Sequence, residues 1–170
     1  MKPEKKVYES FQRFTEFMPY EAENDLLILK GHLLVEELLS ELIQHFLSKG
    51  NPLNIKLEKN IMFSQKLNLC WALMRNNIDD QLWDNLKKLN LLRNSMSHSL
   101  EPKDFNEKIE KFITAVFTSN DVERHIEYMT KYSMFNIDMY AGKELYFAIS
   151  WLTNSLSTKL YSIETELITK

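Results

Sequence analysis

Three residues near the middle of the chain could do chemistry together: Arg93, Asn94 and His98, in the segment from Leu92 to His98. A guanidinium can hold a phosphate or carboxylate with two parallel hydrogen bonds. An imidazole near its ordinary pKa can take or return a proton. A lone histidine near a helix end is more often a capping or solvent-facing residue, so only the combination of Arg93 with His98 indicates a site.

Arg93 lies on an otherwise apolar stripe. The segment from about Asp79 predicts a helix, and alternating four- and three-residue steps place six residues on one face: Leu82, Leu86, Leu89, Arg93, Met96 and Leu100. An unpaired buried guanidinium costs several kcal/mol, so we expect Arg93 to lie at a cleft, to meet a carboxylate or to face a protein interface. A structural ion pair with another helix, or a stripe that ends before Arg93, would also explain the pattern.

Arg93 and His98 do not share a face of a regular helix. At about 100° per residue, their offset puts them about 140° apart around the axis. Ser97, Ser99 and Pro102 could loosen the helix end and reduce this angle. Alternatively, two copies of the chain could meet along the stripe, because a two-fold axis would bring both arginines and both histidines to one cleft.

The segment resembles the signature of the HEPN superfamily, in which an arginine, usually followed by a polar residue, precedes a histidine by a few residues near a helix end. Arg93, Asn94 and His98 match this signature. The residues just before Arg93 and the helical pattern from Leu26 to Ile43 are also similar to the family's pattern, so the resemblance spans about residues 21–118. It implies an all-α, HEPN-like antiparallel bundle of about six to seven helices.

The resemblance also implies a function. Active members of the family are metal-independent endoribonucleases whose site is assembled at a homodimer interface. Carried over by position, His98 would be the general acid or base, Arg93 would hold the phosphate, and Asn94 would orient or bind it. We therefore expect an RNA substrate, a toxin-antitoxin or phage-defence role, and an antitoxin or other regulatory protein as a candidate partner.

A second hypothesis stays open beside the first. In the toxin branch of the family a tyrosine commonly stands two residues after the histidine, whereas this chain has Leu100. Many HEPN-like proteins lack catalysis and act as dimerising or binding modules. The alternative is therefore a noncatalytic dimerisation, protein-interaction or regulatory module, which the acidic pI near 5.8 favours slightly.

His32 and Glu36 are candidates for a supporting role. They are four residues apart, so they share a helix face, and they follow Gly31, which would let another backbone approach closely. They form either a local pair or, with Glu36 near Arg93 or His98, a part of the site. Two ligands do not make a metal site and the chain has no HExxH motif, so we expect no metal.

Lys87 and Lys88 precede the motif and could contact phosphate, as substrate-binding residues. Three aspartates, Asp79, Asp80 and Asp84, come just before them and offset most of their charge. The formal net charge of −3 likewise argues against a general nucleic-acid coat, though not against a contact confined to one site.

The elements that must position these residues are all helical. With only 3 Gly and 4 Pro, the chain has little turn chemistry for strands. We expect helices over 3–18, 21–49, about 58–75, from about 79, and over 104–117, 121–132 and 142–168. The predicted apolar face of the second helix consists of Leu26, Leu29, Leu33, Leu34, Leu38, Leu42, Ile43 and Phe46.

Length and composition predict one domain over residues 1–170, with a HEPN-like core at about 21–118 and C-terminal helices (119–170) packed on it. The buried setting expected for the single cysteine, Cys70, and the lack of a signal peptide or membrane-spanning stretch predict a cytoplasmic protein with no membrane partner. No Gly-rich phosphate loop, nucleophile elbow or paired-cysteine motif occurs, so we expect no cofactor. Trp71, Trp83 and Trp151 are predicted core or interface anchors.

Overall fold

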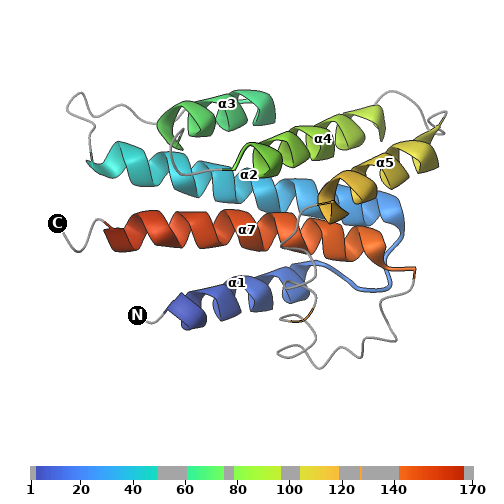
Figure 1. Ribbon diagram of the computed structural model, residues 1–170, viewed down its shortest axis with the longest axis horizontal. Coiled ribbons are helices and arrows are strands. Elements are labelled where there is room, and N and C mark those ends of the chain that lie inside the picture. The colour runs from blue at the N-terminus through green and yellow to red at the C-terminus, as the bar shows by residue number, and fades with distance from the viewer. Residues whose placement is uncertain are drawn as a thin grey trace.

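The computed structural model describes residues 3–49, 61–74, 79–96, 104–118, 127 and 142–166. These residues contain α-helices and no strand, so the predicted all-α class is confirmed. Figure 1 shows the helices lying roughly along one direction as a bundle. They are α1 (Pro3–Phe17), α2 (Asn24–Lys49), α3 (Phe63–Met74), α4 (Asp80–Met96), α5 (Phe105–Phe117) and α7 (Glu144–Glu166).

Helices α2 and α7 form the centre of the bundle and run in the same direction (Figure 1). Gly31 of α2 faces Ile149 of α7, and a Cβ built on Gly31 would lie 2.4 Å from Cγ2 of Ile149. The close approach expected at Gly31 is therefore present, although it is made by a side chain rather than by a backbone. The buried residues of α7 belong to the same core as those of α2.

Helix α1 packs on the side of α7 that faces away from most of α2 (Figure 1). The ring of Phe14 meets that of Tyr146 edge-on, with centroids 5.1 Å apart. Arg13 also reaches α2, where it pairs with both Glu37 and Glu41. The predicted first helix, ended by Pro19, is thus confirmed as an arm held by aromatic packing and by a double ion pair.

Helices α3 and α4 cover α2 on the side away from α1, and α5 packs on α4 and α7 (Figure 1). Contacts between α2 and α3 join His32 to Phe63, Glu36 to Lys66 and Leu39 to Cys70. Later residues of α2 meet later residues of α3, so these two helices are parallel rather than antiparallel. Helix α4 then runs back along α2 and α3, and α5 packs beside α4.

The predicted apolar face of α2 was wrong in its first half. Leu26, Leu29 and Leu33 are exposed, Leu33 by 52%, while Leu27, Ile28 and Val35 are buried in their place. In the second half of the helix the predicted face holds, because Leu34, Leu38, Leu42 and Ile43 are buried. The reason is that α7 docks at Gly31 and turns the adjoining face of α2 inward, which leaves three leucines on the outside.

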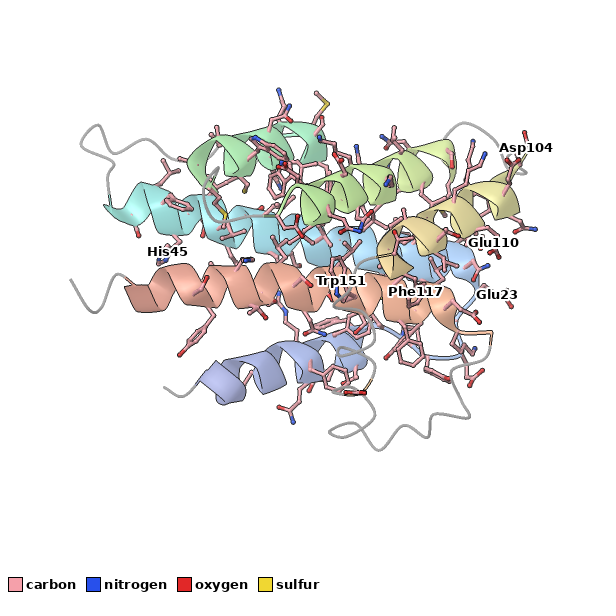
Figure 2. The ribbon with its side chains drawn as sticks, viewed as in Figure 1. Glu23, His45, Asp104, Glu110, Phe117 and Trp151 are labelled. Carbon is pink, nitrogen blue, oxygen red and sulfur yellow. The ribbon has the colours of Figure 1, made fainter. Side chains whose placement is uncertain are left out.

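The three tryptophans predicted as core or interface anchors all pack in or against the hydrophobic core. Trp83 and Trp151 are buried, and Trp71 is half-buried against Trp83 with ring centroids 5.4 Å apart. Cys70 is fully buried, its thiol donates a hydrogen bond to the backbone oxygen of Leu39, and burial raises its pKa to about 12. Figure 2 marks the length of the bundle, with His45 and Asp104 at opposite ends and Trp151 between them.

Most predicted helix bounds agree with the structure to within a few residues. The third helix begins later than expected, at Phe63. The helix predicted over 121–132 lies outside the described residues, apart from residue 127. No helix in the described parts of the chain is both long and apolar enough to cross a membrane.

Candidate functional site

Arg93 and Asn94 stand in the last turn of α4, and the rest of that helix fixes their position. Asp79 accepts a hydrogen bond of 3.0 Å from the backbone N–H of Gln81, which satisfies one of the open donors at the helix start. The apolar stripe packs inward through Leu82, Leu86 and Leu89. Arg93, one turn further along the same stripe, is only half-buried.

A cavity of about 260 Å³ lies between α2, α3 and α4. Its lining combines charged, polar and aromatic side chains from these three helices: His32, Glu36, Met62, Phe63, Ser64, Asn90, Arg93 and Asn94. Figure 1 shows α3 and α4 on the same side of α2. Of the settings predicted for Arg93, the structure therefore places it at a cleft.

His32 forms part of the cavity wall and is held from two sides. Its Nε2 lies 3.1 Å from Oδ1 of Asn90, and because an amide oxygen only accepts, the imidazole N–H donates. The ring stacks on Phe63 with centroids 4.2 Å apart. Burial lowers the pKa of His32, and the positive charges of Arg93 and Lys66 lower it further, against the opposing effects of the Asn90 hydrogen bond and of Glu36.

Glu36 does not pair with His32, so the predicted local pair is wrong. Instead, Oε1 of Glu36 accepts a hydrogen bond of 2.8 Å from Nζ of Lys66. Lys66 is only 9% exposed, which is unusual for a lysine and needs a partner such as this carboxylate. Glu36 lines the same cavity as Arg93. This agrees with the alternative prediction, in which Glu36 lies near Arg93 or His98.

The cavity wall carries both an acidic and a basic side chain. Among its lining residues, Glu36 is the acidic group and Arg93 the permanently cationic one. Lys66 pairs with Glu36, and the lowered pKa of His32 favours its neutral form. A small cavity lined by a guanidinium and by three amide or hydroxyl side chains, Ser64, Asn90 and Asn94, offers several hydrogen-bond donors to a ligand with several oxygens.

No protein-family model, curated protein or solved structure matches this chain.

The two motif residues that the structure describes are adjacent in space as well as in sequence. Nη1 of Arg93 donates a hydrogen bond of 3.4 Å to Oδ1 of Asn94, which holds the guanidinium at the cavity wall. His98 and Leu100 lie outside the described residues. The distance from Arg93 to His98 therefore stays a prediction of the sequence.

Lys87 and Lys88 do not line this cavity. Nζ of Lys87 lies 3.1 Å from Oδ1 of Asp84 and 5.0 Å from the centroid of the Trp71 ring. Lys88 points to the opposite side of α4, where it lines a groove toward α5. The structure thus brings four of the six described candidates together, His32, Glu36, Arg93 and Asn94, and leaves the two lysines outside.

The sequence did not point to the other lining residues, Met62, Phe63, Ser64 and Asn90, or to Lys66, which pairs with Glu36. A signal for Lys66 was present, since α3 buries residues at positions 63, 67, 70 and 74 and Lys66 falls within that apolar face. Asn90 precedes Arg93 and Asn94 by one helical turn, so it shares their side of α4. Within the described ranges, no three His, Cys, Asp or Glu side chains gather closely enough to hold a metal ion.

Proposed function

We propose that this chain is a HEPN-type, metal-independent endoribonuclease, a toxin or defence effector, with a composite site at a homodimer interface. The observation that carries the proposal is the position of Arg93. It lies beside Asn94 on a polar cavity, although the preceding residues of its helix stripe, Leu82, Leu86 and Leu89, are buried. A guanidinium in such a place can hold an RNA phosphodiester through two parallel hydrogen bonds.

The reaction needs no group beyond those of the chain and the RNA. The 2′-hydroxyl oxygen attacks the adjacent phosphorus, the bond from phosphorus to the 5′ oxygen breaks, and a 2′,3′-cyclic phosphate and a 5′-hydroxyl end form. His98 takes the proton of the 2′-hydroxyl or returns one to the leaving oxygen. Arg93 stabilises the charge that develops on the phosphoryl oxygens, and Asn94 orients them.

The surface beside the cavity supports the homodimer. Leu29 and Leu33 lie three or four positions from His32 and Glu36 on α2, so this exposed apolar stripe borders the cavity. Met62, also exposed, lines the cavity itself. Apolar side chains gathered at the rim of a polar cleft are typical of a protein interface, and a two-fold axis there would join the clefts of two copies.

The test is incubation of the protein with a mixed RNA pool in excess chelator, followed by analysis of the cleaved ends. We expect the wild type to leave cyclic phosphate ends, and Arg93→Ala and His98→Ala to lose cleavage while remaining folded. Arg13→Ala and His45→Ala, which remove the same side-chain types away from the cavity, should cut RNA like the wild type. Absence of cleavage by the wild type would refute the proposal, as would full activity of His98→Ala.

Subunit mixing tests the composite site separately. If each site takes Arg93 from one copy and His98 from the other, random mixing of the two inactive variants makes half of the dimers mixed, each with one complete site. Cleavage should then recover to about a quarter of the wild-type rate. No recovery would show that the site lies within one chain.

A noncatalytic interaction module is the second candidate, and the exposed leucines of α2 favour it. In that case Arg93 and His98 belong to a polar network at an interface, and no RNA is cut. His98→Ala would then change self-association or stability, measured by light scattering and thermal unfolding. RNA binding distinguishes the two candidates, because a phosphate-held complex weakens steeply with salt and an interaction module does not bind RNA.

A further inference from the structure

A second hollow, on the opposite side of α4 from the cavity, has a different chemistry. It is a groove of about 400 Å³ between α4 and α5, with an apolar floor of the buried Leu92 and Phe112 and with the exposed Leu91 at its opening. Leu91 is 66% exposed, the largest value among the exposed large apolar residues described. Its exposure places an apolar side chain in the open part of the groove, where it is available to a ligand.

Lysines from both helices line this groove. Lys88 belongs to α4, and Lys108 and Lys111 belong to α5. Among the described residues, the hydrogen-bond partner of Lys88 is the neutral amide of Asn85, 3.4 Å away, and no carboxylate there pairs with this ammonium. Lys111 pairs with Glu107 one turn earlier and also lies within the field of Asp104, so the positive charge that remains over the groove comes mainly from Lys88 and Lys108.

We infer that this groove binds an acidic peptide segment of a partner protein, with a large apolar side chain on the floor and carboxylates beside the lysines. Charge complementarity favours this ligand over an amphiphile with a single headgroup. A single headgroup would contact the lysines of one helix only, whereas a peptide can present carboxylates to the lysines of both helices. The volume fits an anchor of one or two side chains, because the lining spans only about one turn of each helix.

The inference does not depend on the proposed ribonuclease. At about 100° per residue, Lys88 and Leu92 lie roughly opposite Asn90 around α4, so the cavity and the groove use different faces of the same helix. Substitutions in the groove therefore leave the lining of the cavity intact. The two proposals can fail independently.

The test is fluorescence anisotropy with the full chain and a labelled 12-residue peptide that has Leu and Trp one helical turn apart and Glu at the flanking positions. We expect saturable binding that weakens as salt rises. Leu91→Gln should weaken it about tenfold, through loss of apolar contact, and Lys88→Gln about threefold. Lys87→Gln is the matched control, since it removes the same charge from the next residue of α4 but outside the groove, and it should bind like the wild type.

Four outcomes of the binding assay would overturn the inference. They are no binding by the wild type, equal loss in the Lys87 and Lys88 variants, unchanged binding by Leu91→Gln, and equal binding of a peptide whose Leu and Trp are replaced by Ser. Circular dichroism of each variant excludes unfolding as the cause of a loss. If Leu91→Gln instead dissociates an oligomer of the protein, the groove is occupied by a second copy and the inference is also wrong.

Discussion

The ion pair between Glu36 and Lys66 should show a strongly asymmetric response to removal of either partner. The side chain of Lys66 is 11% exposed and that of Glu36 is 29% exposed. In Glu36→Met the ammonium stays buried without its acceptor, and we expect the free energy of unfolding to fall by about 2 kcal/mol, between the values for exposed and for fully buried pairs. In Lys66→Met the more exposed carboxylate can hydrate, so we expect a loss of about 1 kcal/mol.

The double variant sharpens this prediction. Glu36→Met with Lys66→Met leaves no buried charge and adds apolar surface to the contact between α2 and α3, so it should be about as stable as Lys66→Met alone. The loss is then about 2 kcal/mol smaller than the sum of the two single losses. Glu37→Met is the matched control, because Glu37 is the next residue of α2 but is exposed and pairs with Arg13. It should change stability by about 0.5 kcal/mol or less.

Urea unfolding monitored by tryptophan fluorescence measures these differences. With a slope of about 2 kcal/mol per molar urea, Glu36→Met should move the midpoint down by about 1 M, and Lys66→Met by about half as much. The slopes should stay equal, since the surface exposed on unfolding does not change. A Lys66→Met loss that exceeds that of Glu36→Met, or additive losses in the double variant, would refute the argument from burial.

Three more predictions follow from contacts in the core and at the cavity wall. Gly31→Ala should lower stability by about 1 kcal/mol, because the overlap of its Cβ with Ile149 outweighs the gain in helix propensity; in combination with Ile149→Ala, the two losses should sum to less than expected from the single variants. The pKa of His32 is lowered in the folded state, so its contribution is complete above about pH 6.5 and is lost as the pH falls below that value; His32→Gln should flatten this part of a stability profile measured between pH 5 and 8, and an unchanged profile would contradict the assignment. The thiol of Cys70, buried and with its pKa raised to about 12, should react with a disulfide reagent only as the chain unfolds, and rapid labelling of the native protein would show that α2 and α3 open locally.

The sequence by itself determined the helices, because their signals are local. Pro19 and the capping Asp79 mark one end and one start, and the apolar spacing within each helix does not depend on distant residues. It also determined that Arg93 is out of place in a buried stripe, since a guanidinium resists burial wherever its helix lies. The expectation that Arg93 lies at a cleft, meets a carboxylate or faces an interface followed from that physics alone.

Only the tertiary structure decided which face of α2 is buried and which residues surround Arg93. Apolar residues occur almost all around the first half of α2, so periodicity did not distinguish Leu26 and Leu33 from Leu27 and Ile28. The choice was made by a distant residue, Ile149, which docks where Gly31 has no side chain.

The residue pairs that shape the cavity were likewise decided by tertiary packing. His32 with Asn90 and Glu36 with Lys66 join residues that are 58 and 30 positions apart. No local pattern encodes such contacts, because they form only when α2, α3 and α4 pack together and each buried polar group must find a partner. The sequence could therefore supply candidates for the site, while packing decided which of them meet.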